Sequence, residues 1–367
     1  MKGARPFSGV RRSIAGCSGS GADSFVGGTN NNVAAGLSSG VLSGLYNDAC
    51  DGGSGIGVGS GNTINSSGFN ITEFIGGGEY NGISAGDASF IGAGLGNTLS
   101  GPDAAIVGGE YNNAGGTDGF VGGGYHNVMN SGNNSVIGGG EYNGITGSNI
   151  VIGGGDLNAA STTYSAIVGG YKNTASGNSA TVVGGAYNIA SGTASFAAGD
   201  HADADFIGSF VWSDSSSTSA TKATAGNQFV ARAAGGVTFF TNSAMTTGVK
   251  VAPGSGTWAS ASDRNLKTDV AAIDDAGVLE RVAALPITKW SYISEHGVRH
   301  VGPMAQDFYA AFGVGEDNKH ITSIDEDGVA LAAIKALHRE NAGLRSALAD
   351  TRRQLKQLAA EVATMRR

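Results

Sequence analysis

The chain has little charge and little proline, and each shortage excludes a class of protein. Of its 367 residues, 22 are Lys or Arg and 30 are Asp or Glu, which gives a formal net charge of -8. No basic stripe is present, so we expect no nucleic-acid partner. With only 5 Pro and no three-residue glycine period, the chain is neither a collagen nor a proline-rich linker. It has no run of 18 apolar residues, so we expect no transmembrane helix and no membrane insertion.

Cysteine and metal-ligand signals are also sparse. The spacing of Cys17 and Cys50 does not decide whether they form a disulfide or are two separate buried thiols. The pair His296 and His300 has no third ligand that stands out, so we expect no metal, and no motif predicts a cofactor. The basic segment 1–12 lacks the apolar stretch of a signal peptide, so export by that route is not expected.

What the chain has in excess is glycine. Its 64 Gly are more than twice the usual share of about 7%. Residues 1–262 hold 57 of these and 23 charged residues, whereas residues 263–367 hold 7 Gly and 29 charged residues. Two kinds of sequence are therefore joined end to end. We divide the chain into an N-terminal segment, a repeat region, a connector and a C-terminal module: 1–19, 20–202, 203–261 and 262–367.

A repeat of about fifteen residues fills 20–202. In each of twelve copies an apolar residue stands six positions before a closing Asn, which is Asn31 in the first copy and is replaced by Ala202 in the last. The closing positions lie 14 to 19 residues apart, mostly 15 or 16. The apolar positions are Phe25, Val41, Ile56, Ile75, Ile91, Ile106, Val121, Ile137, Ile152, Ile167, Val182 and Phe196.

A unit of this length predicts one coil of a parallel β-solenoid. It is too short for a helix pair and fits two short strands joined by two tight turns. β-branched residues suit the inward position, and Gly and Asn are expected at the turns because they tolerate left-handed backbone. No phosphate-loop or dinucleotide motif is present, so we interpret the glycines as structural. Four acids fall at one position of the repeat and predict a solvent-facing ladder rather than a pocket: Glu79, Glu110, Glu141 and Asp156.

These repeats resemble the head of trimeric autotransporter adhesins of the Yersinia-adhesin type, whose short repeats have an apolar-x-Gly-x-x-Asn/Ala core. The resemblance implies a left-handed parallel β-roll formed by three chains around a common axis. The sequence departs from that family in its runs of Gly, where the family often has Ala or Ser, and in showing no membrane anchor after the head.

The period is lost in 203–261. Alternating apolar residues predict strands within 208–215 and 227–242, followed by a turn-rich connector. We interpret Trp212 and Trp258 as packing anchors rather than as ligand-stacking residues.

The C-terminal module predicts a small α+β fold that ends in a coiled coil. A helical pattern over 278–285 ends at Pro286, and a strand is predicted over 288–295. Residues 330–367 show a heptad repeat, in which Asn341 occupies an a position that commonly sets register. The seam consists of Ile334, Leu337, Asn341, Leu344, Leu348, Thr351, Leu355, Leu358, Val362 and Met365.

This module resembles the C-terminal intramolecular chaperone of phage endosialidase tailspikes and tail fibres. The likeness rests on a Ser-Asp-x-x-x-Lys opening from Ser262 to Lys267, on a His-x-Gly-x-x-Ala-Gln box from His300 to Gln306, and on the final helix. Members of that family trimerise, guide assembly of the fibre in front of them and then cut themselves off. His300 and Gln306 are expected to position the cleavage site or to stabilise the trimer.

The resemblance implies Ser262 as the nucleophile and Lys267 as its base, with a cleavage junction formed by Ala261, Ser262 and Asp263. A serine hydroxyl is a weak nucleophile that needs an adjacent base, and a lysine can serve when burial lowers its pKa from about 10.4. The side of Ser262 on which the chain is cut stays open. The alternative interpretation is that Ser262 caps a helix and Lys267 is a solvated charge.

Together these patterns predict a homotrimeric fibre protein, a phage tail fibre or a similar adhesin, that meets a glycan or protein receptor on a host cell. Its expected location is the virion or a bacterial cell surface. Two alternatives remain, a trimeric autotransporter passenger and a glycan-degrading tailspike. Nothing in 20–261 looks like a paired-carboxylate catalytic domain. At most, we expect a Ser/Lys endopeptidase that acts once in cis.

Overall fold

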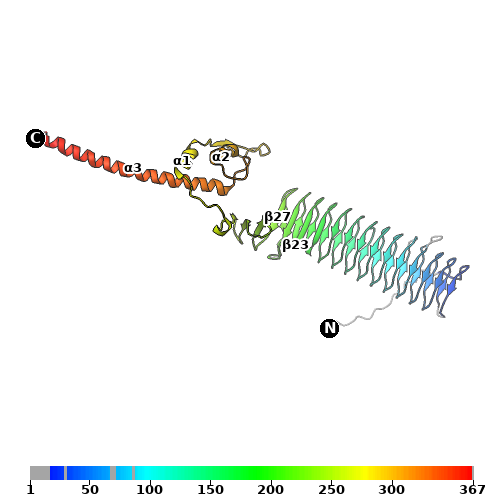
Figure 1. Cartoon of the computed structure of the whole chain (residues 1–367). Helices are drawn as coiled ribbons and strands as arrows, with labels where there is room; N and C mark the ends of the chain where they lie inside the picture. The colour runs from blue at the N-terminus through cyan, green and yellow to red at the C-terminus, as the bar shows by residue number, and fades with distance from the viewer. Residues whose placement is uncertain (1–16, 29–30, 67–71, 85–86, 366–367) are drawn as a thin grey trace. The chain divides into compact units, whose positions relative to one another are not determined.

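The computed structural model describes residues 17–28, 31–66, 72–84 and 87–365. The chain divides between Ala261 and Ser262 into two compact units, which are described separately below (Figure 1).

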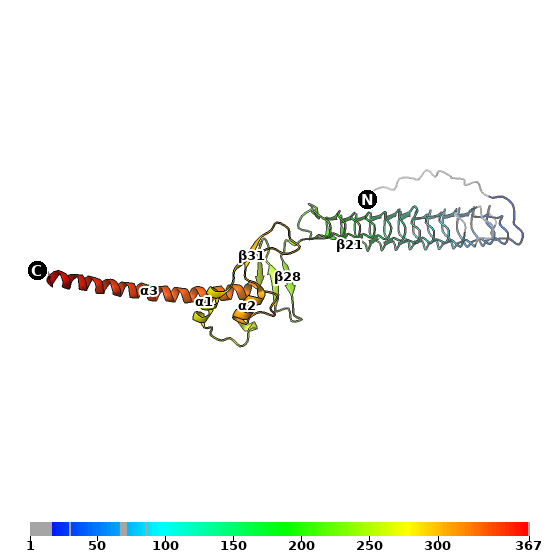
Figure 2. The ribbon, with the colours of Figure 1, turned by 90° about the horizontal axis from the view of Figure 1, so that it is seen from above.

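The first unit is a parallel β-solenoid, with two sheets that each contain one strand from every coil. Figure 2 shows the coils as successive rungs. Sheet 1 contains β1 (Phe25–Val26), β3 (Gly40–Val41), β5 (Gly55–Ile56), β7 (Phe74–Ile75), β9 (Phe90–Ile91), β11 (Ala105–Ile106), β13 (Phe120–Val121), β15 (Val136–Ile137), β17 (Val151–Ile152), β19 (Ala166–Ile167), β21 (Thr181–Ala186), β23 (Phe196–Asp200), β25 (Phe210–Ser213) and β27 (Phe229–Arg232). Sheet 2 contains β2 (Val33–Ala34), β4 (Asp48–Ala49), β6 (Thr63–Ile64), β8 (Gly82–Ile83), β10 (Thr98–Leu99), β12 (Asn113–Ala114), β14 (Val128–Met129), β16 (Gly144–Ile145), β18 (Ala159–Ala160), β20 (Thr174–Ala175), β22 (Ile189–Ala190), β24 (Ala202–Ala204) and β26 (Thr221–Lys222).

The predicted mainly β fold and the parallel solenoid are confirmed. Sheet 2 has 13 strands and sheet 1 has 14, so the solenoid has thirteen full coils rather than the twelve expected. It also continues past residue 202, because β25, β26 and β27 add to the same two sheets. The segment from 203 to 232 therefore keeps the solenoid geometry although its sequence has lost the period.

Two rows of side chains fill the solenoid. The predicted inward row of sheet 1 is confirmed from Val41 to Val182, where every member is at most 1% exposed. A second row in sheet 2, two residues after each closing Asn, was not predicted. Its members are equally buried: Ala34, Ala49, Ile64, Ile83, Leu99, Ala114, Met129, Ile145, Ala160, Ala175, Ala190 and Ala204.

The assignment of the first copy is wrong by one residue. Val26, not Phe25, pairs with Val41, and Asn32, not Asn31, accepts hydrogen bonds from Asn47. Phe25 points outward and is 57% exposed.

The last copy shows the same error. Ala197, not Phe196, pairs with Val182 and is fully buried. The Phe196 ring lies outside the core and stacks on Phe210 with the ring centroids 4.3 Å apart. In both copies two apolar residues adjoin, and the second one pairs with the inward row, although Val26 in the end coil is itself 43% exposed.

The closing asparagines form a ladder inside the solenoid instead of occupying the left-handed turn positions. The Oδ1 of Asn112, for example, accepts from the backbone N of Asn127 at 3.0 Å and from its Nδ2 at 3.1 Å. For the ladder asparagines the prediction of a left-handed backbone is wrong, because positive φ falls on the residue just before each of them; at Asn134, Asn149 and Asn227 it is confirmed. The residues before the ladder asparagines are Asn31, Tyr46, Gly61, Tyr80, Gly96, Tyr111, His126, Tyr142, Leu157, Lys172 and Tyr187.

Two further features complete the first unit. A disulfide joins Cys17 to Cys50, which answers the question that their spacing left open. After the solenoid, sheet 3 is an antiparallel sheet of three strands, β28 (Val237–Phe240), β29 (Gly248–Val251) and β30 (Trp258–Ser260). The rings of Trp258 and Phe239 lie 5.9 Å apart between centroids, but both residues are more than half exposed, so the role of Trp258 as a packing anchor stays a prediction.

The second unit is α+β. The 3-10 helix η1 (Arg264–Leu266) comes first, and then α1 (Asp275–Ala284), β31 (Thr288–Trp290), β32 (His300–Gly302), α2 (Ala305–Phe312) and α3 (Ser323–Met365) follow in order. The two strands pair antiparallel. The core lies between the three α-helices and centres on Val278, Phe308 and Val329. The predicted terminal helix is confirmed and begins earlier than 330.

Candidate functional site

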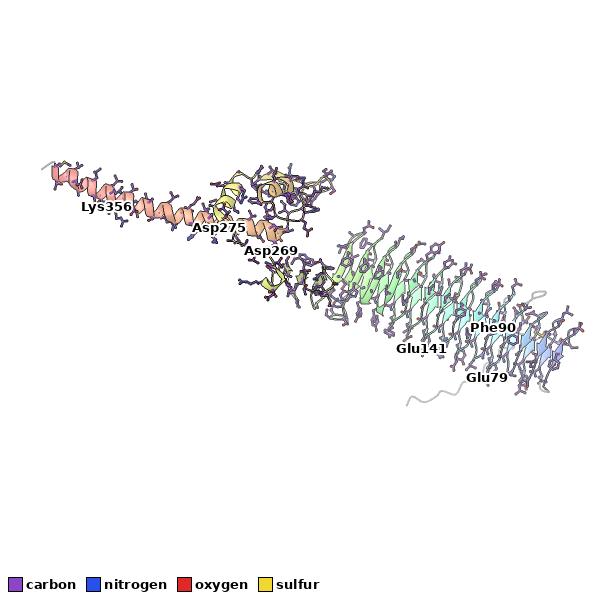
Figure 3. The ribbon with its side chains drawn as sticks, viewed as in Figure 1. Glu79, Phe90, Glu141, Asp269, Asp275 and Lys356 are labelled. Carbon is purple, nitrogen blue, oxygen red and sulfur yellow. A yellow bond between two sulfur atoms is a disulfide. The ribbon has the colours of Figure 1, made fainter. Side chains whose placement is uncertain are left out.

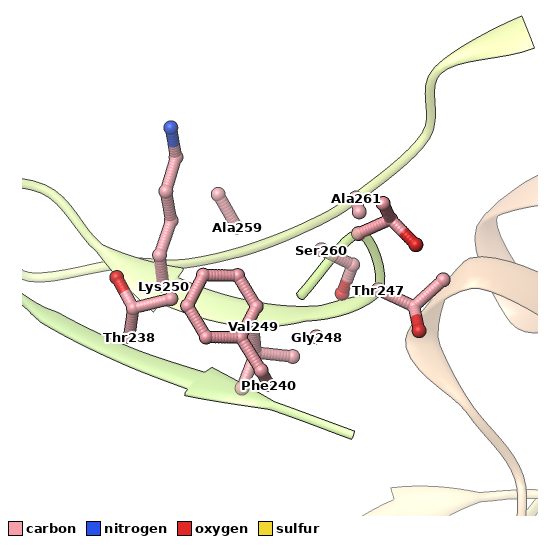
Figure 4. Close-up of a pocket in the computed structure, with 10 residues that line it drawn as sticks. Thr238, Phe240, Thr247, Gly248, Val249, Lys250, Ala259, Ser260 and Ala261 are labelled. Atoms are coloured by element: carbon pink, nitrogen blue, oxygen red, sulfur yellow. The ribbon is translucent and has the colours of Figure 1, made fainter. Parts of the chain in front are cut away.

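The strand that leads into the predicted cleavage junction is held in sheet 3. β30 pairs with β29, with Val251 opposite Trp258 and Val249 opposite Ser260. The backbone N of Ala261 donates to the carbonyl oxygen of Gly248 at 3.2 Å, which extends the pairing one residue further. Figure 4 shows a hollow beside this end of β30, and Gly248 and Ala261 both line it. The chain therefore reaches Ser262 in an extended, hydrogen-bonded form.

A single turn brings Ser262 and Lys267 together. Asp263 caps η1, because its Oδ1 accepts from the backbone N of Asn265 at 2.9 Å. The turn closes when the backbone N of Lys267 donates to the carbonyl oxygen of Arg264 at 3.2 Å. The Nζ of Lys267 then donates to the Oγ of Ser262 at 2.7 Å. The alternative interpretation of Ser262 as a helix cap is wrong, since Asp263 fills that role.

Hydrogen-bond distance is what a nucleophile and its base require. In the single chain, however, both Ser262 and Lys267 are exposed to solvent, and Lys267 is the donor. A lysine accepts a proton only as the neutral amine, and burial favours the neutral form. The geometry is thus suited to attack by Ser262, while the desolvation that activates a lysine requires additional protein to cover the pair. The catalytic roles of the two residues stay a prediction.

His300 and Gln306 lie elsewhere in the second unit. The Nε2 of His300 lies 2.9 Å from the Oε2 of Glu295, and its ring packs against Trp290 with the centroids 4.7 Å apart. Gln306 lies in the first turn of α2. Among the described residues, no hydrogen bond joins either side chain to Ser262 or Lys267. In the single chain these two residues belong to the fold that surrounds β32 rather than to the nucleophile.

A buried carboxylate that sequence reasoning missed fastens α1 to the long helix. Asp275 is 5% exposed, and its Oδ2 lies 3.1 Å from the Nζ of Lys335 and 2.8 Å from the Nη1 of Arg339. Hydrogen bonding to Lys335, with further help from Arg339, holds the pKa of Asp275 below its usual value. Figure 3 labels Asp275 beside α3. Its only sequence signal was its place at the start of an apolar helical pattern.

The recurring acids of the repeat lie one per coil. Glu79, Glu110, Glu141 and Asp156 occupy the same register along the solenoid, in a single run of parallel bridges. Glu79 and Glu141 are labelled along one edge in Figure 3. The three glutamates are exposed, whereas Asp156 is half-buried with its Oδ1 covered. Acids placed in one line differ from the two carboxylates that face each other across one bond in glycoside hydrolysis.

A different acid is buried inside the solenoid. Glu73 is 1% exposed and occupies the interior position that Ser39, Ser54 and Ser89 occupy in neighbouring coils. Both carboxylate oxygens of Glu73 are buried without a hydrogen-bond partner, and burial first, with the neighbouring Asp51 carboxylate second, raises the pKa of Glu73 to about 8. This coil is the longest of the repeats, with 19 residues between successive ladder asparagines. That extra length was the one irregularity that marked it in the sequence.

In the described part of the chain, no group of three or more His, Cys, Asp or Glu is placed to hold a metal ion. Within that part, no helix has both the length and the apolar character needed to cross a membrane.

Comparison with known families identifies the start of the second unit. Residues 262–314 match the Peptidase S74 family, chaperone of endosialidase. The chain thus carries a chaperone-of-endosialidase domain. Its first residue, Ser262, is also the first residue of the second compact unit, and the match covers η1, α1, the strand pair and α2. No curated protein matches the chain. For the repeats, the structure establishes a parallel solenoid, and the resemblance to autotransporter heads stays a prediction.

Proposed function

We propose that this protein is a trimeric fibre of the phage tail fibre or tailspike kind, assembled by its C-terminal chaperone and then freed from it by self-cleavage. A β-solenoid joined to a chaperone-of-endosialidase domain fits such a protein. One observation carries the proposal: the hydrogen-bonded pair Ser262 and Lys267 stands at the boundary between the two units and opens the matched domain.

The exposed seam of α3 supports assembly through this helix. Ile334, Leu337, Leu344 and Leu355 are 62%, 48%, 68% and 60% exposed. The small core of the second unit uses only the first part of α3, around Val329. An apolar stripe at heptad spacing is stable in water only when it packs against another helix. Further copies of the same helix supply that partner.

Charge placement on α3 favours parallel helices. Glu340 precedes Asn341 of the seam at a g position, and Arg345 follows Leu344 at an e position. In a parallel coiled coil, a g residue meets the e residue five positions on in the neighbouring helix, so these two would pair. In an antiparallel arrangement the e positions, which carry Arg345 and Arg352, would meet each other and repel.

The proposed cleavage falls between Ala261 and Ser262, because Ala261 is the last residue held by sheet 3. Lys267, neutral once the assembly covers it, takes the proton of the Ser262 hydroxyl while the Oγ attacks the carbonyl carbon of Ala261. The peptide bond breaks as the lysine returns its proton to the leaving nitrogen, and an ester joins the two residues. Water then hydrolyses the ester. The products are a fibre that ends in the carboxylate of Ala261 and a chaperone that begins with Ser262.

The fibre is proposed to act as an adhesin at the virion tail, with a host-cell glycan or protein as its receptor. Support for this role comes from the fold class alone. The acids of the repeat lie in one line along the rod, one per coil, and this arrangement gives no support to a glycan-degrading activity.

The test is mass spectrometry of freshly expressed full-length protein. The wild type is expected to yield fragments of 261 and 106 residues, whereas Ser262→Ala and Lys267→Ala stay intact. Ser260→Ala and Lys250→Ala are the matched controls in sheet 3, and both are expected to be cut. An intact wild-type trimer, or a cut Ser262→Ala chain, would overturn the proposed cleavage.

A further inference from the structure

The outer face of sheet 1 is uncharged along almost its whole length. In each coil from β1 to β21, we take the four residues that begin with the first residue of the sheet 1 strand and call them a window. Apart from Ser43 and Thr181, these windows hold only apolar residues and glycine. From β1 to β21 the windows are FVGG, GVLS, GIGV, FIGG, FIGA, AIVG, FVGG, VIGG, VIGG, AIVG and TVVG.

Large apolar side chains stand exposed on this face. Phe74, Val107, Val151 and Val168 are 44%, 50%, 50% and 62% exposed, although each lies in or directly after a buried strand. A contiguous apolar surface of this kind marks an interaction site on a soluble protein. The corresponding windows of sheet 2 are rich in Thr, Ser and Asn, as in TINS, which starts at Thr63. The outer face of sheet 2 is therefore more polar than the outer face of sheet 1.

At some glycines on this face, a larger residue would not clash with any other atom of the same chain. Gly138 is not one of them, because a Cβ there would lie 2.3 Å from the carbonyl oxygen of Gly153. At Gly139 and Gly169 the nearest atom to an added Cβ is 3.9 Å and 3.8 Å away, which is ordinary contact, and neither residue has a left-handed φ. Glycine costs folding entropy, so it is kept where a backbone must be approached closely from outside.

We propose that the outer face of sheet 1 is the surface on which copies of this chain pack against one another, rod against rod. The proposal rests on the homotrimer of the proposed function and names the face that the fibre itself contributes. The surface that covers this face must be as long as the face and uncharged, and its structure must repeat with the same rise as the coils. A second copy of the solenoid meets all three conditions.

The size of the face suits such an interface. Thirteen coils at about 4.8 Å each give a length of roughly 60 Å, and a width of about 13 Å then gives roughly 800 Å² per copy. Stable protein interfaces bury about that area on each partner. The face also explains why a chaperone is useful. Successive windows are so alike that two rods could pack one coil out of step, and a separate trimerising unit would set the starting register.

Cysteine cross-linking of the full chain tests the assigned face. Cys17 and Cys50 are paired, and the described residues include no free cysteine, so one new thiol reports on its own position. Val168→Cys follows β19 on the sheet 1 face, and its control, Ser161→Cys, follows β18 on the sheet 2 face; both positions are exposed. A short bismaleimide is expected to cross-link chains through residue 168 at least tenfold more than through residue 161.

Paired glycine variants provide a second measurement. Gly139→Leu with Gly169→Leu places bulk on the proposed interface, while Gly82→Leu with Gly144→Leu places it on sheet 2, where an added Cβ meets nothing within 4 Å. We expect circular dichroism to show a folded solenoid in both, with a lower thermal midpoint only for the first pair. Equal midpoints, together with equal cross-linking in the thiol experiment, would overturn the assigned face. A wild type that sediments as a monomer would overturn the trimer as well.

Discussion

Replacing one asparagine in the middle of the ladder should weaken the whole solenoid. Asn127 is fully buried, and its Nδ2 donates to the Oδ1 of Asn112 at 3.1 Å and to the carbonyl oxygens of Gly123 and Gly140 at 2.9 and 2.8 Å. Its Oδ1 accepts from the backbone N and the Nδ2 of Asn143 at 3.1 and 3.0 Å. Asn127→Ala removes all of these bonds and leaves the backbone N–H of Asn143 buried without an acceptor.

The expected loss follows from those contacts. A buried hydrogen bond contributes about 1 kcal/mol net, and a buried donor left without a partner costs about 1–3 kcal/mol. Five such bonds are lost and one donor is left unpaired, so the free energy of unfolding of the solenoid should fall by at least about 3 kcal/mol per chain. Coils interact mainly with their nearest neighbours, so a defect in the middle also divides the cooperative unit.

The assay is guanidinium unfolding followed by circular dichroism, with Asn130→Ala as the control. Asn130 lies three residues further along the same coil, with its side chain exposed. We expect a clearly lower midpoint for Asn127→Ala and a change within about 0.5 kcal/mol for the control, as is usual at surface positions. Equal midpoints for the two variants would refute the structural role of the ladder.

Three other predictions concern single side chains. Because burial raises the pKa of Glu73 to about 8, the folded state keeps a proton that the unfolded state releases above about pH 4.5. The free energy of unfolding should therefore fall as the pH rises from 4.5 to 8, by at most about 1.4 kcal/mol per pH unit. Thermal melts between pH 5 and 8 should show this slope in the wild type and not in Glu73→Gln. Lys335 lowers the pKa of Asp275, so the ion pair should stabilise the second unit at pH values above the usual aspartate pKa. This stabilisation should be lost as the pH falls and Asp275 is protonated, and thermal melts of Asp275→Asn should lack that acid-dependent loss. Asn341→Leu should raise the melting temperature of the chaperone trimer and allow other oligomers, which sedimentation would reveal. A single trimeric species of unchanged stability would contradict the proposed role of Asn341 in setting the register.

The repeat itself was readable from sequence because one inward side chain per coil must be apolar. Its phase was ambiguous where two apolar residues adjoin, as at Phe25 and Val26, since a shift of one residue exchanges the two faces of a strand. Pairing between coils resolves this ambiguity, because the second strand residue joins the inward row, at Val26 and Ala197 as at Ile152. The second inward row had a signal, an apolar residue two positions after each Asn, but seven of its twelve members are Ala, which is a weak marker.

Other features depend on contacts between coils and could not be read along one copy. Asparagine suits a left-handed turn and a buried amide ladder equally well, and only the neighbouring coil shows that Asn127 bonds to Asn112. The disulfide between Cys17 and Cys50 likewise depends on the fold. The approach of Lys267 to Ser262 was expected only through family resemblance. The local reason, a turn capped by Asp263, follows from the structure.

The asparagine ladder makes the length of the rod adjustable. The Oδ1 of every ladder asparagine accepts from the backbone N of the next one, so these bonds do not record how many coils lie between the two ends. Removal of residues 144–158 would put Asn143 where Asn158 now stands and let Asn173 bond to it without a broken contact. The fibre would shorten by one step of about 4.8 Å with both ends unchanged. Duplication of a coil would lengthen it by the same step, so lineages could alter the reach of the fibre by whole coils without redesigning its core.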